Sequence, residues 1–159
     1  MSHDKQVFSI NEGEQTIVFV TKGELMTKLV DIEGIGPVYA KKLLSAGVRA
    51  MGELLKKGAT PKGRKEIAAA SGIGGRLILE WVNHADLFRI KGVASEYSDL
   101  LEAAGVDTVV ELSKRDAKKL LATIAEVNRK KNLTRHVPNE KQVRSWIAQA
   151  KKLPRAISY

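Results

Sequence analysis

The residues of this chain best suited to chemistry are two glycines in the stretch DIEGIGPVYAKKLL, residues 31–44. Gly34 and Gly36 flank Ile35, and Pro37 follows where the apolar spacing predicts that a helix begins. Glycine has no Cβ, so a ligand can approach its backbone closely. Amides at the start of a helix have no intrahelical partner and favour anions. The pattern therefore predicts an anion-binding loop, with Ile35 packed between the two helices that it joins.

Basic side chains follow this loop and make phosphate the expected anion. Lys41 and Lys42 lie in the next turn of the predicted helix, within reach of a neighbouring phosphate. Such contacts hold a nucleic-acid backbone without reading its bases, so binding would be independent of sequence and sensitive to salt. A glycine hairpin can also serve only to bring two helices close together, and that alternative stays open.

A related pattern recurs 38 residues later, where Gly72 and Gly74 flank an isoleucine. Gly75 and Arg76 follow, which places a guanidinium in the first turn of the next predicted helix. This second hairpin is therefore a further candidate for phosphate contact.

Catalysis finds no support in the sequence. The chain has no cysteine and three histidines, His3, His84 and His136, which lie far apart and lack metal-ligand spacing. His84 is expected on a helix surface or partly packed. No P-loop string occurs, and Ser71 has no plausible base. We therefore expect a protein that is not an enzyme, with no catalytic residue and no cofactor.

The helices that must position these loops belong to an internal duplication. An offset of 58 residues lays Gly34 over Gly92 and carries residues 32–57 onto 90–115. The matched residues include Ile32 with Ile90, Tyr39 with Tyr97, Leu43 with Leu101 and Glu53 with Glu111. Further on, Trp81 matches Trp146 at an offset of 65, so the second copy has gained about seven residues. Both tryptophans are expected in the core.

The second copy has poorer hairpins. Its loops read Gly92-Val93-Ala94 and Val137-Pro138-Asn139, and Glu96 and Asp99 stand where the first copy has Val38 and Lys41. Carboxylates there would repel phosphate, so we expect these loops to be structural.

Residues 1–25 differ from the rest. The runs KQVFSI and QTIVFV predict a β-hairpin or an extended arm, and the segment carries two lysines and four acidic residues, a net charge of −2. Such an arm could dock to a protein partner by pairing with a sheet edge.

Charge and composition agree with a polyanionic partner. The 159 residues carry a net charge of +9, with +4 on residues 26–88 (ten basic, six acidic) and +7 on residues 89–159 (fifteen basic, eight acidic). Solubility alone can also explain such a charge. No apolar run is long enough to span a membrane and no signal peptide is evident, so we expect a cytoplasmic protein with no membrane partner.

Within residues 26–153, GIGPVYAKKL resembles the helix-hairpin-helix motif of DNA repair and recombination proteins, and the wider run through GRKEIAAASGIGGRLILEWVNHADLFRIKGV resembles the DUF4332 family. The resemblance implies an all-helical fold. It also implies that the amides of Gly34, Gly36 and Val38 grip phosphate. The carbonyls of Val30, Ile32 and Ile35 would hold a monovalent cation.

The expected architecture is all-α, with an N-terminal arm (1–25), two helix-hairpin-helix repeats (26–88 and 89–153) packed on one core, and a tail (154–159). The expected function is sequence-independent nucleic-acid binding, chiefly by the first repeat. The alternative is a protein–protein adaptor or scaffold that uses the arm and the helical body.

Overall fold

The computed structural model describes residues 5–9, 17–21 and 29–159 of the chain. The first two segments form a β-hairpin, in which β1 (Lys5–Ser9) pairs antiparallel with β2 (Ile17–Thr21) and Val7 lies opposite Phe19. The strands fall on the two runs that predicted them. Docking of residues 1–25 to a partner stays a prediction, and much of that segment lies outside the described residues.

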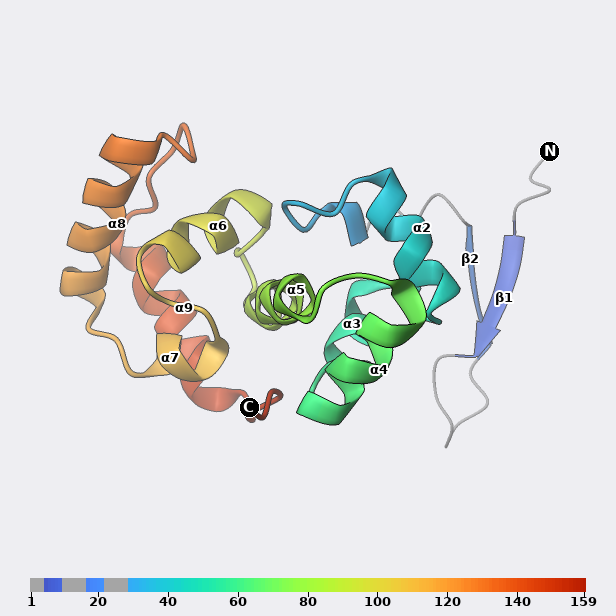
Figure 1. The fold of residues 1–159 in the computed structure, drawn as a ribbon. Helices are drawn as coiled ribbons and strands as arrows, with labels where there is room; N and C mark the ends of the chain where they lie inside the picture. The colour runs from blue at the N-terminus through green and yellow to red at the C-terminus, as the bar shows by residue number, and fades with distance from the viewer. Residues whose placement is uncertain (1–4, 10–16, 22–28) are drawn as a thin grey trace.

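The body of the protein is helical, as predicted (Figure 1). Its helices are α2 (Pro37–Ser45), α3 (Met51–Lys57), α4 (Pro61–Ser71), α5 (Gly75–Leu87), α6 (Ser95–Ala103), α7 (Val109–Ser113), α8 (Ala117–Lys131) and α9 (Glu140–Lys152). α5 lies at the centre, with α2, α3 and α4 on one side and α6 to α9 on the other (Figure 1). The helix that ends the first half is therefore also the one that the second half packs against.

The two halves repeat one local geometry. Gly34 and Gly92 have φ angles of +90° and +96°, and an added Cβ would lie 3.4 Å from Trp81 Nε1 in the first case and 3.1 Å from Trp146 Nε1 in the second. Each tryptophan ring also packs on a tyrosine, with 5.1 Å between ring centroids in both halves. The indole beneath each hairpin therefore sets how closely the turn approaches the helix below.

The hydrophobic residues form two clusters rather than the single core expected from the sequence. Trp81 (1% exposed) belongs to the first cluster and Trp146 (2% exposed) to the second, so both are core residues, as predicted. The seam between α5 and α6 carries buried polar side chains, among them His84, Asp86 and Ser98. Because polar groups in a seam must be hydrogen-bonded rather than packed among methyl groups, they divide the apolar core in two.

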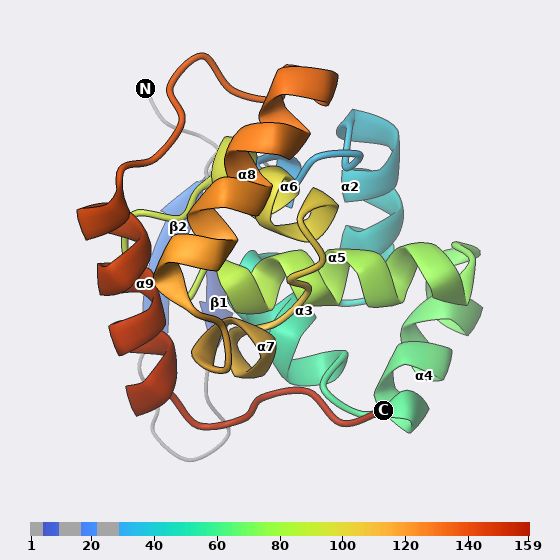
Figure 2. The same cartoon turned by 90° about the vertical axis from the view of Figure 1, so that its left-hand side faces the viewer.

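The C-terminal residues 154–159, expected as a simple tail, return to the first half of the protein (Figure 2). Ile157 is 3% exposed and joins the first hydrophobic cluster. The Ser158 amide donates to the Ala59 carbonyl at 2.8 Å, and Arg64 Nη2 donates to the Ser158 carbonyl at 2.9 Å. The last residues therefore strap the second half to the first.

Candidate functional site

The first glycine hairpin has one glycine that the fold requires and one that it does not. Gly34 has a φ of +90°, which disfavours any residue with a Cβ. Gly36 is the N-cap of α2 with φ −87° and ψ −175°, an extended conformation open to every residue, and an added Cβ would meet no atom within 4 Å. Ile35 between them is 3% exposed and packs in the first cluster, as predicted.

Several backbone amides at this hairpin have no hydrogen-bond partner. Within the described residues, the amides of Gly34 and Gly36 donate no hydrogen bond. α2 begins with Pro37 and has no side-chain cap, so the amides of Val38 and Tyr39 in its first turn lack a partner. The amides of Gly34, Gly36 and Val38 are thus unpaired at and just before the N-terminus of α2.

The carbonyls predicted for a monovalent cation are not equally available. Ile32 accepts the Ile35 amide at 3.1 Å, so one lone pair of its oxygen is already engaged in the turn. Ile32 is also fully buried, whereas Val30 is 37% exposed. Cation binding by Val30, Ile32 and Ile35 stays a prediction.

The two lysines of the first hairpin are exposed on α2 and form no ion pair within the described residues. Lys42 Nζ lies 5.7 Å from the centroid of the Tyr39 ring. A cation held by an aromatic face keeps its charge available to an anion on its other side. Lys41 and Lys42 are therefore free to face a phosphate near the start of the helix.

The second hairpin repeats these features without the lysines. Gly72 ends α4 with φ +73°, and Gly74 is the uncapped N-cap of α5 with φ −60°. An added Cβ at Gly72, Gly74 or Gly75 would meet no atom within 4 Å, and Arg76 is exposed in the first turn. The start of α5 is thus a second open helix N-terminus.

The hairpins of the second half differ in ways that disfavour an anion. α6 has the uncapped N-cap Ala94, but Glu96 lies in its first turn and accepts from Thr134 Oγ1 at 2.9 Å. α9 is closed by a capping box, in which Asn139 and Gln142 bond each other's backbone amides at 2.8 and 2.9 Å. Of the seven added residues, two lengthen the end of α8 and five lie in the loop between α8 and α9 (132–139, against 72–74 in the first half), before this cap.

His84 is fully buried, whereas the sequence led us to expect it on a helix surface or partly packed. It is 3% exposed, with Nε2 at 2.6 Å from Glu102 Oε2 and Nδ1 at 3.1 Å from Ser98 Oγ. The repeat alignment pairs His84 of α5 with Gln149 of α9, and this pairing gave the wrong expectation. α9 is the last helix of the body, whereas α5 is covered by α6. The contact between His84 and Glu102 was not predicted from the sequence. The only signal there was the i, i+4 spacing of Glu80 and His84, which places a carboxylate beside this histidine.

Acidic groups gather around this histidine. One ligand atom each from Glu80, His84 and Glu102 lies within 4.8 Å of the others, so these three side chains could hold a metal ion. Burial raises the pKa of nearby Asp99 to about 6; His84 lowers this pKa, while Glu33, Glu102 and Glu80 raise it. Glu33 belongs to the first hairpin, so the acidic cluster lies close enough to that hairpin for their charges to interact.

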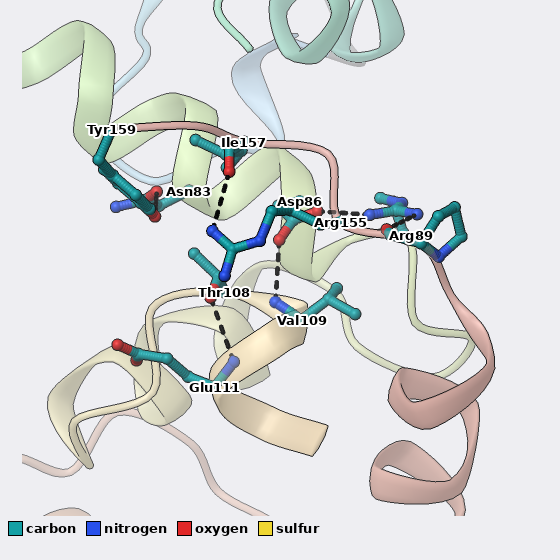
Figure 3. A network of polar contacts seen from close by, with 10 residues as sticks. Asn83, Asp86, Arg89, Thr108, Val109, Glu111, Arg155, Ile157 and Tyr159 are labelled. Atoms are coloured by element: carbon teal, nitrogen blue, oxygen red, sulfur yellow. Dashed lines mark hydrogen bonds and ion pairs between the residues drawn. The ribbon is translucent and has the colours of Figure 1, made fainter. Parts of the chain in front are cut away.

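Asp86 is the centre of a second buried network at the seam (Figure 3). Its side chain is 2% exposed and accepts from Arg89 Nη1 at 2.8 Å and from the Val109 amide at 2.9 Å. Arg89 in turn donates to the Pro154 carbonyl at 2.9 Å. One carboxylate therefore joins the end of α5, the start of α7 and the C-terminal strap.

A cavity of about 400 Å³ lies beside this network, between α5, α7 and the last residues of the chain. Tyr159 closes one side of it and donates to Asn83 Oδ1 at 3.1 Å, while Arg155 reaches the Ile157 carbonyl (Figure 3). Burial raises the pKa of Tyr159, and the nearby carboxylates of Asp86, Glu111 and Asp107 raise it further. The phenol therefore stays a hydrogen-bond donor.

No helix among the described residues is long and apolar enough to cross a membrane.

Comparison with known proteins identifies a family and no individual relative. A search of curated proteins and a search of solved structures each found no match. The DUF4332 family, described as a domain of unknown function, matches residues 33–153, from the first hairpin to the end of α9. The chain therefore belongs to the DUF4332 family.

Proposed function

We propose that this protein binds nucleic acid through its phosphates, independently of sequence and without catalysing a reaction, with the helix-hairpin-helix loops at Gly34–Gly36 and Gly72–Gly74 as its contacts. The observation that carries the proposal is the second glycine of each loop. Gly36 and Gly74 have extended or ordinary negative φ values, and a Cβ there would meet nothing. The fold itself accepts Ala94 and Asn139 as the equivalent N-caps of α6 and α9.

Since the fold does not require glycine at Gly36 or Gly74, close approach of a ligand explains these residues better than helix packing. Unpaired amides at a helix N-terminus suit a phosphate, and the net charge of +9 supplies long-range attraction to a polyanion. Lys41 and Lys42 beside the first loop, and Arg76 beside the second, provide the positive side chains for neighbouring phosphates.

Reversing the charge of Lys41 and Lys42 tests this function directly. We expect wild-type protein to bind a labelled duplex of about 30 base pairs, with affinity that falls steeply from about 50 to 200 mM salt. Lys41→Glu/Lys42→Glu should lower the affinity by at least about tenfold and make the salt slope shallower by about 2, because two phosphate contacts are lost. Fluorescence anisotropy across a salt series measures both quantities.

The matched control is Lys151→Glu/Lys152→Glu, which changes the charge equally at two exposed, adjacent lysines in the last turn of α9. We expect it to weaken binding only slightly. Equal losses in the two variants would mean diffuse charge attraction rather than a hairpin site, and no binding by wild-type protein at about 50 mM salt would refute the function. Two duplexes of unrelated sequence should bind alike.

Alanine substitutions separate the two glycines of the first hairpin. Gly36→Ala should change stability by no more than about 0.5 kcal/mol, because its backbone is extended, yet weaken nucleic-acid binding about tenfold by blocking an amide–phosphate contact. Gly34→Ala should destabilise the protein by about 1–2 kcal/mol because of its φ of +90°. Urea denaturation and anisotropy measure the two effects.

Gly52→Ala is the control for this pair, since Gly52 lies exposed in α3 and an added Cβ there meets nothing. It should leave binding unchanged and raise stability slightly. If Gly36→Ala binds as wild type does, the phosphate does not approach that glycine.

A further inference from the structure

We propose that Glu80, His84 and Glu102 form a binding site for one divalent transition-metal cation at the seam between α5 and α6. One ligand atom of each side chain lies within 4.8 Å of the others. Glu80 and His84 are four residues apart on α5 and share a helix face, while Glu102 comes from the last turn of α6. The cation would therefore join the two halves of the protein, and the proposal is independent of nucleic-acid binding.

The ring of His84 is oriented with Nδ1 held by Ser98 and Nε2 facing Glu102. Ser98 Oγ donates its single proton to the Ser95 carbonyl at 2.9 Å, so it must accept from His84 Nδ1, which lies 3.1 Å away. Nδ1 therefore carries a proton, and Nε2 faces Glu102 Oε2 at 2.6 Å, a distance at which the two atoms share a proton that a bound cation would displace. A histidine whose second nitrogen donates to an oxygen is the usual arrangement behind a metal-bound imidazole.

Among the described residues, the carboxylates at the seam have no cationic partner other than His84. Among the ion pairs of the described residues, Glu102 and Asp99 contact only His84, and Glu80 forms none. His84 is 3% exposed, so the negative charge of the carboxylates around it lies at the edge of the protein interior, where solvent screens it poorly. A divalent cation would add positive charge at the point where the three ligand atoms converge.

The ligand set indicates the kind of cation. Mg²⁺ and Ca²⁺ prefer oxygen ligands alone, whereas one imidazole with two carboxylates suits Zn²⁺ and its neighbours in the first transition row. Three protein ligands leave a position for water, as in open zinc sites. Zn²⁺ is therefore the probe of choice and Mg²⁺ the comparison.

Titration calorimetry of the full chain, prepared without a histidine tag, tests the site. Wild-type protein should bind one equivalent of Zn²⁺, bind Mg²⁺ far more weakly, and unfold roughly 5 °C or more higher with saturating Zn²⁺. Glu80→Gln and Glu102→Gln should each lower Zn²⁺ affinity at least about tenfold and reduce the thermal shift. Both side chains are partly exposed, so these variants are expected to fold. Ser98→Ala should lower affinity about tenfold by freeing the imidazole.

Three variants distinguish this site from casual binding elsewhere. Glu66→Gln removes an exposed carboxylate of α4, and His136→Gln and His3→Gln remove the other histidines of the chain; all three should bind Zn²⁺ as wild type does. Loss of binding in either histidine variant would overturn the assignment. So would unchanged binding in Glu80→Gln/Glu102→Gln, or no binding of Zn²⁺ by the wild type, in which case the seam holds only a shared proton.

Discussion

Replacing Trp81 by alanine is expected to lower the free energy of unfolding by about 3–5 kcal/mol, the largest loss from any single truncation in the first cluster. The indole is 1% exposed, supports the turn at Gly34, and packs edge-on against Tyr39 with 5.1 Å between ring centroids. Alanine would remove both contacts and leave a cavity beneath the hairpin. Urea denaturation followed by circular dichroism measures the change.

Trp81→Phe is the control, because phenylalanine keeps an aromatic ring against Tyr39 while losing part of the indole. It should cost clearly less than alanine. A loss below about 1 kcal/mol in Trp81→Ala would contradict the central place of this residue in the first cluster. Since Trp81 lies beneath the first hairpin, Trp81→Ala should also weaken nucleic-acid binding, if the proposed function is right.

Replacing Asp86 by alanine is expected to cost about 3–5 kcal/mol, a loss comparable to that of Trp81→Ala. The carboxylate is 2% exposed and holds Arg89 and the Val109 amide, so its removal leaves a poorly solvated charge and an unpaired amide at the start of α7. Because these groups join the two halves, we expect the halves to unfold separately in the variant. The wild type should unfold in one step.

The two tryptophans of the chain can report separate unfolding of the two halves, because each hydrophobic cluster holds one of them. Trp81→Phe leaves Trp146 as the reporter of the second half, and Trp146→Phe leaves Trp81 as the reporter of the first. In the Asp86→Ala background, the fluorescence midpoints in urea should diverge between these reporters. Coincident midpoints, with a loss under about 1 kcal/mol, would show that the Asp86 network does not couple the halves. Glu66→Gln, at an exposed site, should keep the midpoints together.

The helices and turns of the first hairpin follow from interactions close in sequence. Apolar residues three and four apart predict the helices, and proline at the first helical position predicts where α2 begins. Gly34 and Gly72 take positive φ angles, as expected of hairpin glycines. The burial of Trp81 was predictable for the same reason, because it lies on the apolar face of a helix. The burial of Ile35 was predictable because it is the apolar residue between two loop glycines.

The polar contacts at the seam could not be predicted from the sequence, because the residues that pair there are far apart along the chain. Glu102 lies 18 residues after His84, and Val109 lies 23 residues after Asp86. Each pairing depends on how α6 and α7 rest on α5, which no local pattern specifies. A match between His84 and Gln149 in a repeat even predicted the wrong environment, because repeats share local structure while their neighbours differ.

By itself the sequence determined the helical body, the starts of α2 and α5 and the buried tryptophans, since these depend on period, turn chemistry and apolar spacing. It also marked the two strand-forming runs, while leaving open whether they form a β-hairpin or an extended arm. Only the tertiary structure decided that the core divides in two, that His84 meets carboxylates at the division, and that Ile157 straps the halves together. The physical reason is that α5 belongs to the first repeat yet supports the second. A residue on its outer face, solvent-exposed in a lone repeat, is therefore buried in the pair.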